Sequence, residues 1–169
     1  GDRIKMAMFY FSERRIVAAL KTALKKGVSV QLLLDSNSES FGHRRIGIPN
    51  RFTAWELQGE GAEIRWADTH GEQMHAKMLL ALHQSGEAYL LAGSANYTRR
   101  NLAGFNLELD VEVVGKANQP FFASADAFFD RMWLNRGGHY SVEYARFADE
   151  SHMKRWLMRF QEFSGMGTF

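Results

Sequence analysis

The chain has 169 residues, of which 46% are hydrophobic and 24% are charged, and its formal net charge is +2. This composition is typical of one globular domain with a sizeable core, and it excludes disorder, collagen and coiled coil for the chain as a whole. The absence of cysteine excludes disulfides, thiolate metal sites and cysteine nucleophiles. No apolar run approaches the ~20 residues of a membrane helix, and the small net charge does not identify a nucleic-acid binder.

The first third of the chain predicts a parallel β-α-β unit. Residues 4–11 and 28–34 are short apolar runs that indicate buried strands, and residues 13–26 carry apolar side chains at helical spacing. Two strands joined by a helix within ~30 residues are typical of parallel pairing. The elements expected next are a polar loop over residues 35–50, a helix that Pro49 and Asn50 begin and that runs through residue 57, and a strand over residues 62–66.

The remaining sequence predicts a larger, mixed sheet. The elements expected there are strands over residues 74–82, 88–94 and 107–114, a long helix over 120–136 and an amphipathic helix over 152–163. The fold class is therefore expected to be α/β, a mixed β-sheet flanked by helices on both faces, in a single domain over residues 1–169. Because the chain begins at Gly1 rather than methionine, we expect it to be a piece of a longer protein.

Four polar side chains are predicted to meet at the open end of one hairpin. If strands 74–82 and 88–94 are joined by a tight turn at Ser85–Gly86, regular pairing places His75 opposite Asn96 and Lys77 opposite Ser94. A histidine supplies a nucleophilic or proton-transferring nitrogen near neutral pH. The lysine, serine and asparagine supply a cation and hydrogen-bond donors, which together suit an anionic centre such as a phosphodiester.

Neighbouring residues extend this site. Gly93 would let the backbone approach a phosphate closely, and Glu108 could orient the imidazole and stabilise its cation. Asp110 and Glu112 share a strand face with Glu108 and are expected to be solvated. Read on their own, Ser94 and Asn96 could instead cap a short helix that begins near residue 98.

The motif residues resemble the signature of the phospholipase D superfamily, which is His-x-Lys-x4-Asp, then Gly-Ser-x-Asn, then a later acidic residue. The matching segments are His75-Ala-Lys77, Gly93-Ser94-Ala-Asn96 and Asn106-Leu-Glu108, with Leu82 at the position of the aspartate. The similarity extends over about residues 4–135 and looks like the C-terminal half of bacterial phospholipase D-like and cardiolipin synthase-like proteins that carry two such motifs.

The resemblance implies a phospholipase D-like fold, as one of two repeats, and a reaction without metal or cofactor. One histidine attacks phosphorus to form a phosphohistidine, a second histidine from another copy of the motif protonates the leaving alcohol, and water or another alcohol resolves the intermediate. The catalytic residues it implies are His75, Lys77, Asn96 and Glu108, and the substrate-binding residues are Gly93, Ser94 and Arg99.

One copy of the combined motif is present, so the chain is expected to supply half of an active site and to be inactive as a monomer. The other half would come from an N-terminal domain of the parent chain or from a second copy across a two-fold axis. The surface built to meet it should be partly apolar and exposed. The predicted function is a phosphodiesterase or phosphatidyltransferase acting on phospholipid. The alternatives are a dimeric nuclease of the same superfamily and a catalytically silent structural half.

Two further points stay open at the level of the sequence. Asp68, His70, Glu72 and His75 lie close together along the chain and, without the resemblance, could be metal ligands, although their spacing matches no helical ligand motif. The compartment is not determined. The resemblance is compatible with a bacterial protein that a segment preceding Gly1 attaches to a membrane or directs out of the cytoplasm.

Overall fold

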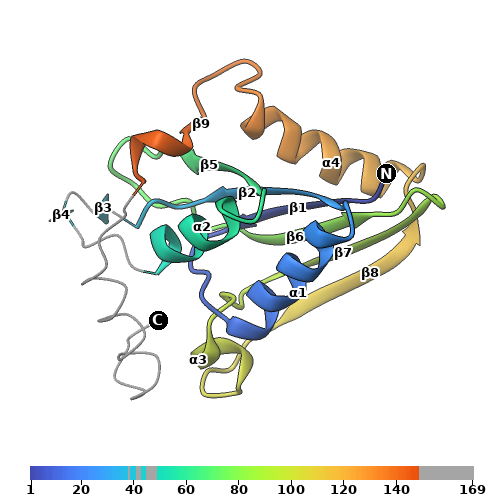
Figure 1. Ribbon diagram of the computed structural model, residues 1–169, viewed down its shortest axis with the longest axis horizontal. Coiled ribbons are helices and arrows are strands. Elements are labelled where there is room, and N and C mark those ends of the chain that lie inside the picture. The colour runs from blue at the N-terminus through green and yellow to red at the C-terminus, as the bar shows by residue number, and fades with distance from the viewer. Residues whose placement is uncertain (38, 41–42, 45–48, 149–169) are drawn as a thin grey trace.

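A seven-stranded mixed sheet forms the centre of the molecule (Figure 1). The computed structural model describes residues 1–37, 39–40, 43–44 and 49–148. Neighbouring strands follow the order β8-β7-β6-β1-β2-β5-β9, in which only the β1–β2 and β2–β5 pairs of this sheet are parallel. The strands are β1 (Arg3–Met8), β2 (Ser29–Leu34), β5 (Glu63–Ala67), β6 (Lys77–Leu82), β7 (Glu87–Gly93), β8 (Asp110–Lys116) and β9 (Ser141–Glu143).

Helices cover both faces of this sheet, which confirms the predicted α/β architecture. Helices α1 (Arg14–Lys25) and α2 (Asn50–Gln58) pack on one face, and α4 (Pro120–Trp133) packs on the other (Figure 1). The smaller elements are the helix α3 (Arg99–Leu102), the 3-10 turn η1 (Tyr144–Arg146), and the separate strand pair β3 (Glu39–Ser40) and β4 (His43–Arg44). Within the described ranges, the helices are too short or too polar to cross a membrane.

Apolar residues fill the two layers between the sheet and its helices. On the α1 and α2 side, Val17, Leu20 and Leu57 pack against Met6 and Leu32. On the other side Phe122, Phe129 and Trp133 of α4 pack against Ala7 and Leu80. The aromatic spacing of α4 predicts a buried face that also includes Phe121 and Phe128, but these two side chains are half exposed. The first strand therefore contacts both layers, and its carboxyl end is held rigidly at the centre of the sheet.

Several element boundaries differ from the prediction. Strand β1 ends at Met8 rather than at residue 11. The Phe9 N–H still follows the β1–β6 register and donates to the Ala76 carbonyl, but the N–H groups of Tyr10 and Phe11 donate to the side chains of Asn96 and Asn50. Strand β6 begins at Lys77, so His75 precedes the strand. The helix expected over 152–163 lies outside the described residues.

The predicted register of the β6–β7 hairpin is wrong by one residue. Met78 lies opposite Ala92, and continuing this pairing by one step places Lys77 opposite Gly93 instead of Ser94. The loop has three residues rather than two, since the N–H of His83 already donates to the Glu87 carbonyl at 2.8 Å. Its last residue, Gly86, has a φ of +86°, the left-handed conformation that closes three-residue hairpin loops.

Candidate active site

His75 and Lys77 lie together at the carboxyl end of β1, in contact with one aromatic ring. The centroid of the Phe9 ring lies 5.0 Å from the centroid of the His75 ring. The same Phe9 centroid lies 5.4 Å from Nζ of Lys77. Lys77 Nζ also donates to the His75 carbonyl at 3.0 Å. The backbone is fixed beside them, because the Phe9 N–H donates to the Ala76 carbonyl at 2.9 Å. This end of the sheet thus holds an imidazole and a buried cation as one unit.

The second part of the motif is built around the carboxylate of Glu108. Ser94 Oγ donates to it at 2.6 Å, and the side-chain amide of Asn101 donates to its other oxygen. Ser94 Oγ in turn accepts from the Leu109 N–H at 2.9 Å. The predicted bond between Glu108 and the His75 ring is not formed: these two described side chains make no hydrogen bond with each other. Glu108 instead fixes the hydroxyl of Ser94.

Gly93 is required by a close approach of two segments of the chain. A Cβ at this position would overlap with Asp110 Oδ1 and with the Leu109 carbonyl. The same Asp110 oxygen accepts from the Ala95 N–H at 3.1 Å. Asp110 was expected to be solvated, but its carboxylate is half-buried and holds the segment that carries Ser94.

Asn96 reaches the same end of the sheet through a short stretch of parallel pairing. Residues Phe11 and Tyr97 form an isolated bridge, and Asn96 Oδ1 accepts from the Tyr10 N–H at 3.3 Å. The capping role considered for Ser94 and Asn96 is not observed, because Thr98 occupies the position before α3. Arg99 is the first residue of α3 and is exposed.

The surroundings of His75 favour its neutral form. Burial lowers the pKa of the imidazole below its ordinary value, and the positive charge of Lys77 lowers this pKa further. Burial also lowers the pKa of Lys77, against the opposing effect of the Glu108 carboxylate. Hydrogen bonds from Ser94 and Asn101 lower the pKa of Glu108. A neutral imidazole keeps a nitrogen lone pair free, as a nucleophile requires.

We expect the His75 imidazole to titrate below its ordinary value of 6.5, and Lys77→Met to raise its midpoint. The substitution removes the neighbouring positive charge but leaves burial in place, so the midpoint should stay below 6.5. A pH titration of the ring carbon signals by NMR measures it. Lys116→Met, at the end of edge strand β8, is the control and should leave the midpoint of the His75 titration unchanged. A downward move in Lys77→Met would contradict the assigned electrostatics.

The metal alternative finds little support in the geometry. Asp68 and His70 approach to 3.6 Å, but no group of three metal-binding side chains forms among the residues that the structure describes. His75, the last member of the set considered as metal ligands, packs its ring against Phe9.

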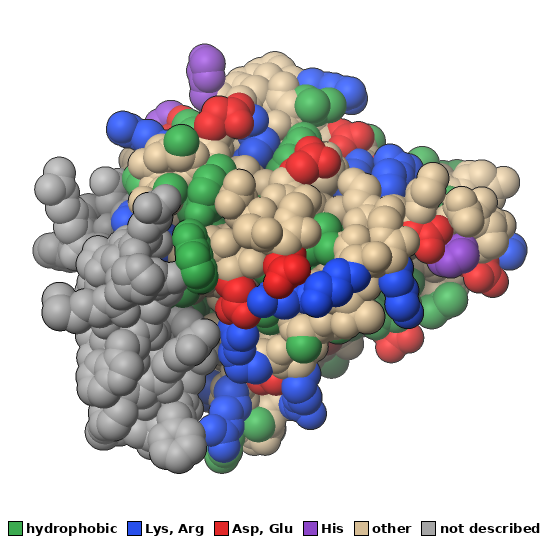
Figure 2. All heavy atoms as spheres, in the orientation of Figure 1, with side chains coloured by type: hydrophobic (Ala, Val, Ile, Leu, Met, Phe, Trp, Pro, Cys, Tyr) green, Lys and Arg blue, Asp and Glu red, His purple; other side chains and the backbone are tan. Residues whose placement is uncertain are grey.

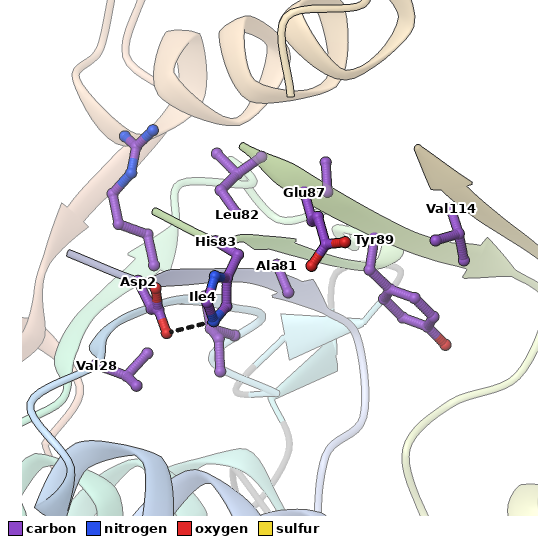
Figure 3. A pocket seen from close by; sticks show the side chains of 11 residues that line it. Asp2, Ile4, Val28, Ala81, Leu82, His83, Glu87, Tyr89 and Val114 are labelled. Carbon is purple, nitrogen blue, oxygen red and sulfur yellow. Dashed lines mark ion pairs between the residues drawn. The ribbon is translucent and has the colours of Figure 1, made fainter. Parts of the chain in front are cut away.

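A cavity of about 400 Å³ lies at the other end of the β6–β7 hairpin, away from His75. Figure 3 shows Asp2 and His83 facing each other at this cavity. Nε2 of His83 lies 3.1 Å from Oδ2 of Asp2. Apolar side chains that include Ile4, Ala81 and Val114 line much of the rest. The cavity therefore shares none of the motif residues.

Exposed apolar residues surround Glu108 along the chain. Phe105 and Leu109 are 70% and 77% exposed, and Leu107 is fully exposed. They lead into β8, which is an edge strand of the sheet and exposes Val111 as well. An apolar surface of this kind, called here the 105–111 surface, is typical of a protein contact.

Sequence reasoning missed three side chains that build this site. Asn101 and Asp110 hold Glu108 and the Ser94 segment, and Phe9 contacts both His75 and Lys77. Asp110 carried a usable signal, since it follows Glu108 by two residues in the segment 107–114 that the sequence predicts as one strand; in the structure β8 begins only at Asp110. Phe9 and Asn101 carried none, because their contacts depend on how distant segments pack.

Comparison with known proteins assigns the chain to a family. Residues 1–133 match the family model described as cardiolipin synthase, PLD-like domain. The match covers most of the chain, and the chain therefore belongs to this family of the phospholipase D superfamily. No curated protein matches the sequence.

Solved structures show the same fold. NucT from Helicobacter pylori is 19% identical with a TM-score of 0.58, covering 78% of this chain and 79% of NucT. Nuc from Salmonella typhimurium, a phospholipase D family member, is 20% identical with a TM-score of 0.57, covering 83% and 82%. Phosphatidylserine synthase from Haemophilus influenzae Rd KW20 is 12% identical with a TM-score of 0.59, covering 96% of this chain and 40% of the synthase. The chain has the phospholipase D-like fold.

Proposed function

We propose that the chain supplies one half of a phosphatidyl-processing active site, as a hydrolase or a phosphatidyltransferase that works through a phosphohistidine. The observation that carries the proposal is the contact of His75 and the buried Lys77 with one ring, that of Phe9, in a member of the cardiolipin synthase PLD-like family. Burial and Lys77 lower the pKa of the His75 imidazole, which favours the neutral form that a nucleophile needs. Family membership supports phosphodiester chemistry in general, and the choice of phospholipid rests on the description of the matching family.

In the proposed reaction, a ring nitrogen of His75 attacks phosphorus. A nitrogen–phosphorus bond forms while the bond from phosphorus to the leaving alcohol oxygen breaks. A histidine of the second half gives its proton to that oxygen, and then takes a proton from the water or alcohol that attacks the phosphohistidine and releases His75. The second histidine therefore gives up one proton in the first step and regains one in the second, so both histidines end in their starting protonation states.

The remaining motif residues would hold the phosphate oxygens. Lys77 uses one of its three N–H donors on the His75 carbonyl, which leaves two for an anion. The side-chain amide of Asn96 provides further donors, with Gly93 and Ser94 beside it in the chain and Arg99 at the exposed rim. The one hydroxyl proton of Ser94 is donated to Glu108, so Ser94 would bind a phosphate oxygen by exchanging that bond for one to the substrate. Glu108 would act through Ser94, whose hydroxyl it fixes.

Two observations support a half-site. In-line displacement needs a nucleophile and an acid on opposite sides of phosphorus, and His83, the other histidine of this hairpin, pairs with Asp2 at the far end of β6. Eight residues of extended chain separate the two histidines, or more than ~20 Å. The 105–111 surface lies beside the Ser94–Glu108 pair and is apolar, as a contact with a second half requires. We call the chain bound to that second half the paired form.

The paired form is expected to process phosphatidylglycerol vesicles at least about tenfold faster than single- or double-stranded DNA, and to keep this activity after exhaustive chelation. Lys77 and the hydrogen-bond donors of the site already supply the charge that a metal would provide. Head-group release and DNA cleavage, each measured with and without EDTA, check both statements. Activity that disappears on chelation and returns with zinc or magnesium would contradict the metal-free scheme.

A nuclease of the same superfamily is the second candidate. Figure 2 shows Lys and Arg side chains gathered on the lower part of the visible face, over α1 and α3, and α3 follows the site directly. Part of this charge is neutralised, because Arg14 and Lys21 pair with Glu56. DNA cleavage without lipid turnover in the same assay would favour this candidate over the first.

A further inference from the structure

A buried polar cluster lies directly behind the segment that carries His75. Its members are Asp35 at the end of β2, Asn37, and Asn50 at the start of α2, and they are 2%, 4% and 0% exposed. The amide nitrogen of Asn50 donates to the carbonyls of Phe9 and Asp35, at 2.7 and 2.8 Å. The cluster therefore ties β2 and α2 to the carboxyl end of β1.

The carboxylate of Asp35 uses both of its oxygens. Oδ1 accepts from the backbone N–H and the side-chain amide of Asn37, at 2.7 and 3.2 Å. Oδ2 accepts from the backbone N–H of Met74 at 2.8 Å. Met74 precedes His75 directly, and on the other side the Ala76 carbonyl accepts from the N–H of Phe9. The backbone of His75 is thus held at both ends.

We propose that Asp35 is a positioning residue for His75, which holds the imidazole against Phe9 and beside Lys77 through the Met74 N–H. The contribution to turnover rests on the proposed function, whereas the positioning itself does not. Asp35 is not a residue of the motif, and the hydrogen bonds of its carboxylate in the described part of the chain are with Asn37 and the Met74 N–H.

Burying a carboxylate is costly unless all of its hydrogen bonds are satisfied. Burial raises the pKa of Asp35, and its hydrogen bonds with Met74 and Asn37 oppose that change. Apolar side chains could fill the same volume without this cost. The carboxylate is nevertheless suited to one task that an apolar group cannot perform, which is to accept two donors on one oxygen and fix the Met74 N–H with the other.

The test is Asp35→Asn, in which one carboxylate oxygen becomes an N–H donor and an acceptor is lost. We expect the midpoint of the His75 titration to rise toward 6.5, because a less firmly held ring is more hydrated. In the paired form kcat should fall about 10²-fold with KM within about twofold, since misplacing a catalytic group by ~1 Å has effects of this size. The midpoint is read by NMR on the chain alone.

Ser141→Ala is the matched control. Ser141 is also buried and donates to the Met132 carbonyl at 2.8 Å, but it lies on β9 at the opposite edge of the sheet from β8. It should change neither the His75 midpoint nor kcat. If Asp35 only stabilised the fold, Asp35→Asn and Ser141→Ala of equal stability would have the same kcat and the same His75 midpoint.

If Asp35→Asn does not fold, Asn37→Gly takes its place. Asn37 has a φ of +49°, which glycine adopts without strain. The substitution removes the side-chain amide that donates to Asp35 and keeps the backbone N–H that donates to the same oxygen. The expected changes have the same signs and are several-fold smaller. An unchanged His75 midpoint in a folded variant, or a kcat within twofold of wild type in an active pair, would overturn the proposal. Absence of activity in every protein, together with a shifted midpoint, would instead refute the proposed function alone.

Discussion

Replacing His75 with alanine is expected to lower the turnover of the paired form by at least about 10⁴-fold, as loss of a covalent nucleophile does in other enzymes. His75 is the histidine of the matched motif, burial and the Lys77 charge lower the pKa of its ring, and Lys77 donates to its carbonyl. The substitution removes the ring contact with Phe9 but no hydrogen bond of the described backbone, so the fold should persist. Head-group release and far-ultraviolet circular dichroism measure the two effects.

His83→Ala is the control for this substitution. His83 lies on the same hairpin but at its other end, where it pairs with Asp2, and its loss should change turnover by less than about twofold. Quenching the wild-type reaction with base should also trap a phosphoryl adduct on a peptide that contains His75. Near wild-type turnover in His75→Ala would refute the phosphohistidine scheme.

The elements of this fold could be predicted from the sequence because their hydrophobic patterns are local. The mixed sheet, the α1 and α4 helices and the parallel pairing of the first two strands are confirmed. The hairpin register could not be predicted from the same pattern, since the three-residue loop and a two-residue turn at Ser85–Gly86 are both compatible with it. The left-handed Gly86 decides between them in the structure, and one residue changes every partner along β6 and β7.

The motif residues themselves do gather at one end of the sheet, but the contacts between them differ from the prediction. Glu108 holds Ser94 instead of His75, and Phe9 contacts both His75 and Lys77. Asp35 and Met74 are 39 residues apart in the chain and meet through one hydrogen bond. Contacts of this kind depend on how strands and loops pack, and a spacing pattern in one segment carries no information on them.

Leu107→Asp is expected to raise the concentration at which the paired form reaches half of its activity by about 10- to 100-fold. Leu107 is fully exposed and lies next to Glu108. Burying a leucine against a partner is worth ~1.5–3 kcal/mol, and each 1.4 kcal/mol corresponds to about tenfold in affinity. Because the side chain is exposed, the fold of the chain alone should not change. Sedimentation velocity and turnover, measured over the same range of concentrations, check the prediction.

Phe128→Asp is the matched control, since Phe128 is 53% exposed but lies on α4, away from Glu108 and the 105–111 surface. It introduces the same charge at an exposed apolar position and should change neither association nor turnover. A dimer alone would not establish the half-site, because an apolar surface can associate without forming an active centre. Activity must therefore rise with association in the wild type and fall with it in Leu107→Asp. A fully active monomer would refute the half-site, because the described part of one hairpin places its two histidines at opposite ends of β6.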